Sequence, residues 1–149
     1  MQPDAYSDPD LEPAPECFRD LFTGQALAHL DEIVLSWRMG GHPIDWADSV
    51  AAFQVRLAGG PAALFRLHAP GSDLPARLEV DANEAACAGI PPDLVRRLWD
   101  ELATIGKLVE NPHAPLTVPL ARFSRGDRKV FLAYALTIAR TITVLPDEA

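Results

Sequence analysis

The sequence has 149 residues, nearly half of them apolar, which suits one globular domain with a short tail. The formal charge is −8, from 21 acidic against 13 basic residues, so no general electrostatic attraction to nucleic acid or an anionic membrane is expected. Its two cysteines, Cys17 and Cys87, fit neither a disulfide framework nor a metal motif, so we expect reduced thiols and a cytoplasmic location.

Residues 1–15 are expected to form a disordered acidic tail. Five acids and no base occur in residues 1–16, together with several prolines and few large apolar side chains. Such a segment cannot bury enough apolar surface to offset its ordering entropy. We therefore expect one globular domain over residues 16–145 and a disordered C-terminus over residues 146–149.

Two helices are predicted in the first part of the domain. The first covers residues 17–38, with Thr23-Gly24 as either a break or its true start; its apolar stripe is Leu27, Leu30, Val34 and Trp37. The second begins after Asp45, a good N-cap residue, and ends at Gly59. The apolar stripe of the second helix is Trp46, Val50, Phe53 and Leu57.

Alternating apolar residues then predict strands. Residues 65–67 and 76–80 each alternate between apolar and polar side chains, and a turn-rich loop over residues 69–75 joins them. A β-hairpin is therefore expected, with a short helix over residues 61–68 as the alternative. Residues 116–120 alternate in the same way, and Pro119 would confine such a third strand to an edge.

Three further helices are expected, a short one over residues 82–90, a strong one over residues 92–109 and a last one over residues 124–144. No residue between Lys129 and Arg140 is charged, so the last helix is apolar on every side. It is therefore either the central helix of the domain or partly an oligomer interface. The expected fold class is α+β and helix-dominated, with about four main helices packed on a small two- or three-stranded antiparallel sheet.

Motifs with a specific chemistry are absent from the sequence. It has no glycine-rich phosphate-binding motif and no nucleophile elbow around a serine. His29 and Glu32 lie one helical turn apart, but no second pair completes a metal site. We therefore expect no metal and no cofactor.

One local cluster of bases is a candidate site for an anion or a partner. It consists of Arg122, Arg125, Arg128 and Lys129, at the start of the last helix. The helix dipole already places positive charge there, so a bound anion would relieve the conflict. In the alternative interpretation, Ser124 and Asp127 satisfy the free N–H groups and other acids pair with the arginines.

These features favour a small cytosolic protein-interaction, regulatory or adaptor protein without catalytic activity. Only two of the 13 bases are lysine, a bias typical of GC-rich bacterial sequences. The expected partner is another protein or a second copy, with the last helix as the route to a homodimer. One alternative is an anion- or nucleic-acid-binding protein that uses the basic cluster. A second is a small enzyme whose site combines His29, Glu32 and either His68 or His113.

Overall fold

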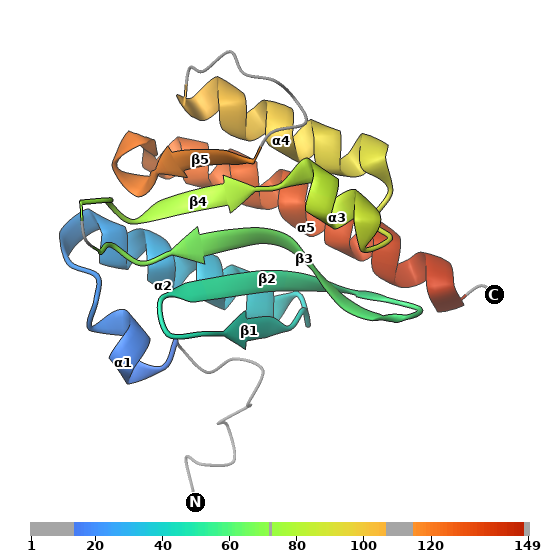
Figure 1. Ribbon diagram of the computed structural model, residues 1–149, viewed down its shortest axis with the longest axis horizontal. Helices are drawn as coiled ribbons and strands as arrows, with labels where there is room; N and C mark the ends of the chain where they lie inside the picture. The colour runs from blue at the N-terminus through green and yellow to red at the C-terminus, as the bar shows by residue number, and fades with distance from the viewer. Residues whose placement is uncertain (1–13, 72, 107–114, 148–149) are drawn as a thin grey trace, which may run out of the picture.

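The fold is built on a five-stranded antiparallel sheet in which every strand pairs with its neighbour in sequence, in the order β1-β2-β3-β4-β5 (Figure 1). The computed structural model describes residues 14–71, 73–106 and 115–147. Within them the strands are β1 (Ile44–Trp46), β2 (Val50–Leu57), β3 (Gly60–His68), β4 (Arg77–Val80) and β5 (Leu116–Pro119).

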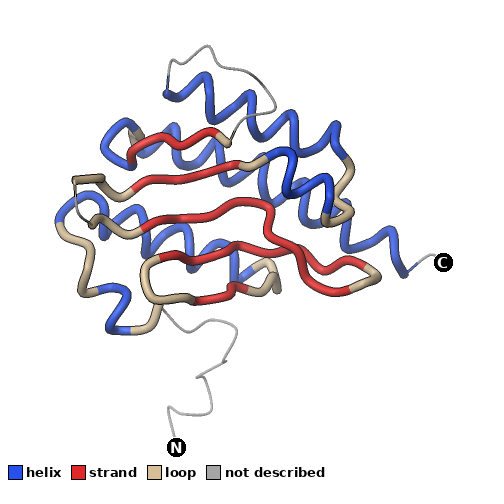
Figure 2. The backbone as a smooth tube through the Cα atoms, in the orientation of Figure 1, coloured by secondary structure: helices blue, strands red, loops and turns tan. Residues whose placement is uncertain are grey.

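Helices cover one face of this sheet. The helices of the chain are α1 (Glu16–Arg19), α2 (Gly24–Met39), α3 (Ala82–Cys87), α4 (Pro92–Gly106) and α5 (Arg125–Asp147), with a short 3-10 turn η3 (Leu120–Arg122) before α5. Figures 1 and 2 show α2 and α5 behind the strands and α4 at the β5 side, and α5 contacts both α2 and α4. The opposite face is left open except at one end, where α3 lies beside β3.

The side-chain pattern of β2 explains why one face is buried. Ala51, Phe53 and Val55 are fully buried, whereas Ala52 and Gln54 between them are only partly buried. Successive residues of a strand point to opposite faces, so the first three meet the helices and the other two face outward.

Four aromatic rings join the sheet to two helices. Phe53 of β2 and Phe65 of β3 are directly paired, and their rings stack with centroids 4.6 Å apart. Trp37 of α2 meets both rings edge-on, and Phe131 of α5 meets Phe65 edge-on. The buried Trp37 Nε1–H donates to the carbonyl oxygens of Pro43 and Gln54, so no polar atom of this ring is left unsatisfied.

A β-bulge shapes the centre of the sheet. The register shifts after Phe53, so that Gln54 pairs with Ala63 while Phe53 pairs with Phe65, and Leu64 has no partner. Leu64 and Phe65 are consecutive and both buried. The bulge therefore lets two neighbouring residues enter the core, and such irregularities also bend and twist the strand that carries them.

Helix α1 closes the β1 side of the core. Its Phe18 is buried against Trp46 of β1, with ring centroids 5.0 Å apart. Arg19 donates two hydrogen bonds of 2.9 and 2.8 Å to the carboxylate of Asp31 and so connects α1 to α2. The break between the two helices falls next to Thr23, where the sequence offered one.

The expected sheet of two or three strands with four main helices is wrong, because residues 44–57 form β1 and β2 and not a helix. Trp46, Val50, Phe53 and Leu57 do recur at helical spacing, but the residues that are fully buried are Ala51, Phe53 and Val55. The same segment therefore also carries apolar residues at every second position, the pattern of a strand. Pairing of β2 with β3 selected the strand over the helix.

The later strands follow the sequence analysis closely. The hairpin is confirmed, since β3 and β4 pair with Leu67 opposite Leu78, and the alternative helix over residues 61–68 is wrong. The third predicted strand is β5, which pairs with β4 and lies at the edge of the sheet, where Pro119 can be accommodated. Residues 1–13 and 148–149 of the expected tails lie outside the described residues, whereas Ala14 is buried and α5 runs to Asp147.

Replacing Phe65 with alanine should lower the free energy of unfolding by about 3–5 kcal/mol, because it removes ring contacts with Phe53, Trp37 and Phe131 and leaves a cavity. Urea unfolding followed by far-UV circular dichroism measures this change. Leu74→Ala, at an exposed loop position, is the matched control and should change the free energy by less than about 0.5 kcal/mol. Equal effects of the two substitutions would contradict the assigned core.

Candidate functional site

The structure divides the predicted basic cluster into two parts. The Arg122 guanidinium donates to the carbonyl oxygen of Gly106 at the end of α4, over 3.2 Å, and Arg128 donates to Nδ1 of His29 on α2, over 3.0 Å. These two side chains therefore hold the start of α5 to its neighbours. Arg125 and Lys129 are exposed, and neither forms an ion pair within the described part of the chain.

The first turn of α5 is capped by the chain itself. The Asp127 amide donates to Ser124 Oγ over 2.9 Å, and the Ser124 amide donates to Asp127 Oδ2 over 3.0 Å. This reciprocal pair is a capping box in which aspartate replaces the more common glutamate. The Asp127 N–H group, which a bound anion would use, is therefore already bonded to Ser124. Anion binding at this cluster stays a prediction.

Replacing Ser124 with alanine should lower the free energy of unfolding by about 1 kcal/mol, because the Asp127 amide loses its acceptor. Chemical denaturation at neutral pH measures the loss. Thr137→Ala, at an exposed position of the same helix, is the control and should change stability by less than about 0.5 kcal/mol. An unchanged midpoint for Ser124→Ala would show that the cap contributes nothing to folding.

His29 is a buried residue with a structural role. Its side chain lies among α2, α5 and the segment before α5, and only 3% of the residue is exposed. Nε2 lies 3.2 Å from the carbonyl oxygen of Phe123, and Nδ1 receives the hydrogen bond from Arg128. Burial and the Arg128 charge both lower the pKa of His29, against the smaller opposing effect of the Phe123 carbonyl, so the ring is held neutral.

The predicted enzymatic site is not assembled from the residues named for it. His29 faces α5 on the helix-covered side of the sheet, whereas His68 of β3 faces the open side. Glu32 is exposed on α2, and His113 lies outside the described residues. Across the ranges that the structure describes, no three His, Cys, Asp or Glu side chains are grouped so that they could hold a metal ion.

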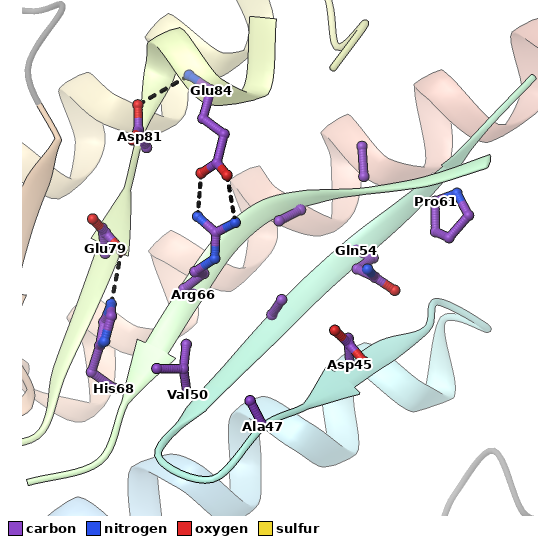
Figure 3. Close-up of a pocket in the computed structure, with 13 residues that line it drawn as sticks. Asp45, Ala47, Val50, Gln54, Pro61, Arg66, His68, Glu79, Asp81 and Glu84 are labelled. Carbon is purple, nitrogen blue, oxygen red and sulfur yellow. Dashed lines mark hydrogen bonds and ion pairs between the residues drawn. The ribbon is translucent and has the colours of Figure 1, made fainter. Parts of the chain in front are cut away.

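The open face of the sheet contains a shallow hollow of about 580 Å³ with charged walls (Figure 3). Arg66 forms a two-pronged ion pair with Glu84 of α3, one contact of which is 2.8 Å long. His68 Nε2 lies 2.8 Å from Oε1 of Glu79 on the neighbouring strand. The hydrogen bonds from Arg66 lower the pKa of Glu84, and those to Glu84 raise the pKa of Arg66.

This hollow has little chemistry to offer. Its floor includes the small side chains of Ala52 and Ala63, and its ion pairs join residues of the wall to one another. No serine, threonine or cysteine is among the lining residues, so His68 has no nucleophile to activate there. The hollow therefore resembles the solvated side of an antiparallel sheet.

The other large surface is the side of the helices that faces away from the sheet. On α5, Phe131, Ala135 and Ile138 are buried, whereas Val130 and Tyr134 are each 44% exposed. On the neighbouring α2, Leu35 is 43% and Met39 is 68% exposed. We call these four exposed side chains, Leu35, Met39, Val130 and Tyr134, the outer helical surface.

Charged residues border the outer helical surface. Tyr134 lines a shallow groove of about 290 Å³ together with Arg97, Asp100 and Glu101 of α4. Lys129 and Arg140 end the uncharged segment of α5. Exposed apolar side chains bordered by charged residues are a common composition of protein–protein interfaces.

Half of this surface follows from the sequence pattern and half was missed. The uncharged segment of α5 indicated an exposed apolar side, but Leu35 and Met39 were not singled out. Both lie off the stripe of Leu30, Val34 and Trp37 that faces the core. Large apolar residues outside the buried stripe of a helix are the signal that could have found them.

Comparison of the chain with known protein families, with characterised proteins and with solved structures found no match. Among the described residues, no helix has both the length and the apolar character needed to cross a membrane.

Proposed function

We propose that this chain is a non-catalytic protein-binding module of the cytoplasm that docks another protein on its outer helical surface. The carrying observation is the distribution of exposed apolar side chains. Within the described ranges six large apolar residues are exposed, Leu21, Leu35, Met39, Leu74, Val130 and Tyr134, and four of the six belong to this surface. The surface belongs to two helices that pack side by side.

The physical argument is one of unfavourable exposure. Each square ångström of apolar surface removed from water contributes about 25 cal/mol, so a partner that covers these side chains gains free energy that solvent does not supply. These exposed side chains are not needed to complete the core. The inward sides of the two helices are already filled by other apolar residues, namely Phe131 and Ile138 of α5 and Val34 and Trp37 of α2.

The charges support the same proposal. Charged residues are absent from the middle of the α5 segment and stand at its ends, as Lys129 and Arg140. Such a rim favours one orientation of a partner and disfavours others. The open sheet face lacks this arrangement, because its charges are interleaved and pair with one another.

Met39→Lys should reduce partner capture by about tenfold or more, because it places a charge among the apolar side chains of the docking surface. Residue 39 is 68% exposed and both residues favour helices, so the fold should be unaffected. The measurement is affinity capture from extracts of the source cells with the full chain as bait, followed by quantitative mass spectrometry.

Leu74→Lys is the matched control, because it adds the same charge at an exposed apolar residue of the β3–β4 loop. A specific partner should be retained by Leu74→Lys and lost with Met39→Lys. The proposal is wrong if both variants capture the same proteins as the unmodified chain. It is also wrong if light scattering shows a dimer that only Met39→Lys dissolves, because the surface would then serve self-association.

A further inference from the structure

Two buried histidines stand at opposite ends of the contact between α2 and α5. His29 lies in the first half of α2 and bonds to Arg128 at the start of α5. His42 follows the end of α2, stacks on Trp37 with centroids 4.9 Å apart, and is only 9% exposed. A Cβ atom on Gly40 would lie 2.8 Å from the His42 ring and 3.4 Å from Leu136 of α5, so this end of the contact is closely packed.

The hydrogen bonds of His29 require a neutral ring. A guanidinium can only donate, so Nδ1 of His29 must accept from Arg128, and Nε2–H donates to the Phe123 carbonyl. Protonation would place an N–H group on Nδ1. It would thereby replace a hydrogen bond with two like charges 3.0 Å apart.

His42 has a similar electrostatic setting. Burial lowers its pKa most, and the charges of Arg56 on β2 and Arg140 on α5 lower it further. Arg128 has the corresponding effect on the pKa of His29, after burial. Among the described residues, the charged groups that act on these two rings are therefore all arginines, and a proton on either ring is opposed by both burial and repulsion.

We propose that His29 and His42 form a proton-sensitive clamp, in which the neutral His29 ring bonds α2 to Arg128 of α5, the neutral His42 ring packs on Trp37 at the other end of α2, and protonation of these rings in mild acid loosens the two helices from each other. Leu35 and Met39 lie between the two histidines along the chain, and Val130 and Tyr134 lie between Arg128 and Arg140. The four side chains of the outer helical surface thus belong to the same packed helices as the clamp, so loosening α2 from α5 would change how they lie relative to one another. We therefore expect a bound partner to be released in acid, an expectation that rests on the proposed function.

The direction of the pH effect follows from proton linkage. The unfolded chain has ordinary histidines with a pKa of about 6.5, whereas burial and arginine lower the pKa of both rings in the fold. Unfolding therefore takes up protons below about pH 6.5. The two neutral rings therefore contribute fully to the free energy of unfolding above about pH 6.5, and this contribution is lost as the pH falls below that value.

The test compares the full chain with a double variant, His29→Gln with His42→Gln. A glutamine at position 29 can still donate to the Phe123 carbonyl and accept from Arg128, but it cannot take up a proton. His68→Gln is the matched control, since His68 faces the open side of the sheet beside Glu79. Hydrogen exchange of α2 and α5 amides is measured at pH 7.5 and pH 5.0 and corrected for intrinsic rates.

The clamp predicts that protection of α2 and α5 falls by about tenfold or more in acid for the unmodified chain and for His68→Gln, and stays constant in the double variant. Equal loss of protection in all three proteins would overturn it. If the double variant fails to fold, NMR titration of the unmodified chain decides. Midpoints below 6.5 for His29 and His42 support the clamp, and a midpoint at or above 6.5 for either ring overturns it.

These readouts need no partner, so the clamp can fail while the Met39→Lys test succeeds, and the reverse. The control of docking has its own experiment, in which partner captured at pH 7.5 is washed at pH 5.0. Release from the unmodified chain and retention by the double variant support it. If both proteins retain the partner equally while protection of α2 and α5 still falls in the unmodified chain, the clamp stands and its control of docking is overturned.

Discussion

The stacked pair of Phe53 and Phe65, with Trp37 and Phe131 edge-on to it, is the contact on which the rest of the molecule depends. It joins β2 and β3 to α2 and α5, and the bulge at Leu64 lets Phe65 pair with Phe53 while both enter the core. Interiors of this kind tolerate few voids, so four interlocked rings fix how the two helices lie on the sheet. This placement of α2 and α5 also brings His29 beside Arg128 and His42 onto Trp37.

The two large surfaces differ because the long helices α2 and α5 pack on one side of the sheet, whereas only the short helix α3 borders the other. The open side can remain in water, since Arg66, His68 and Glu79 alternate with buried residues and pair with one another or with Glu84. On the helical side, the large apolar side chains of Met39 and Tyr134 are exposed. Solvation thus explains the sheet face, whereas for the outer helical surface we propose association with another protein.

Local signals in the sequence located most elements outside residues 44–57. Helix α4 has an apolar stripe that recurs at helical spacing and lies in the core, and the start of α5 is marked by Ser124 and Asp127, which do cap it. The strands β3 and β4 alternate clearly enough to give their pairing. For β1 and β2 the local pattern was ambiguous, because Phe53 belongs to both a four-residue and a two-residue period, and long-range pairing decided between them.

The sequence by itself determined the mixture of helices and strands, the β3–β4 hairpin and the uncharged segment of α5, because each depends on residues close together in the chain. Pro119 indicated an edge strand, but the pairing of β5 with the distant β4 was decided by the tertiary structure. The tertiary structure alone decided that Arg122 and Arg128 serve the helices beside them, that His29 is held neutral, and that Met39 and Tyr134 lie on one helical layer. His29 and Arg128 are 99 residues apart, and only packing can bring such groups within 3.0 Å and remove them from water. A contact of this kind has no local pattern, so the chemistry of His29 could not be inferred from its neighbours in sequence.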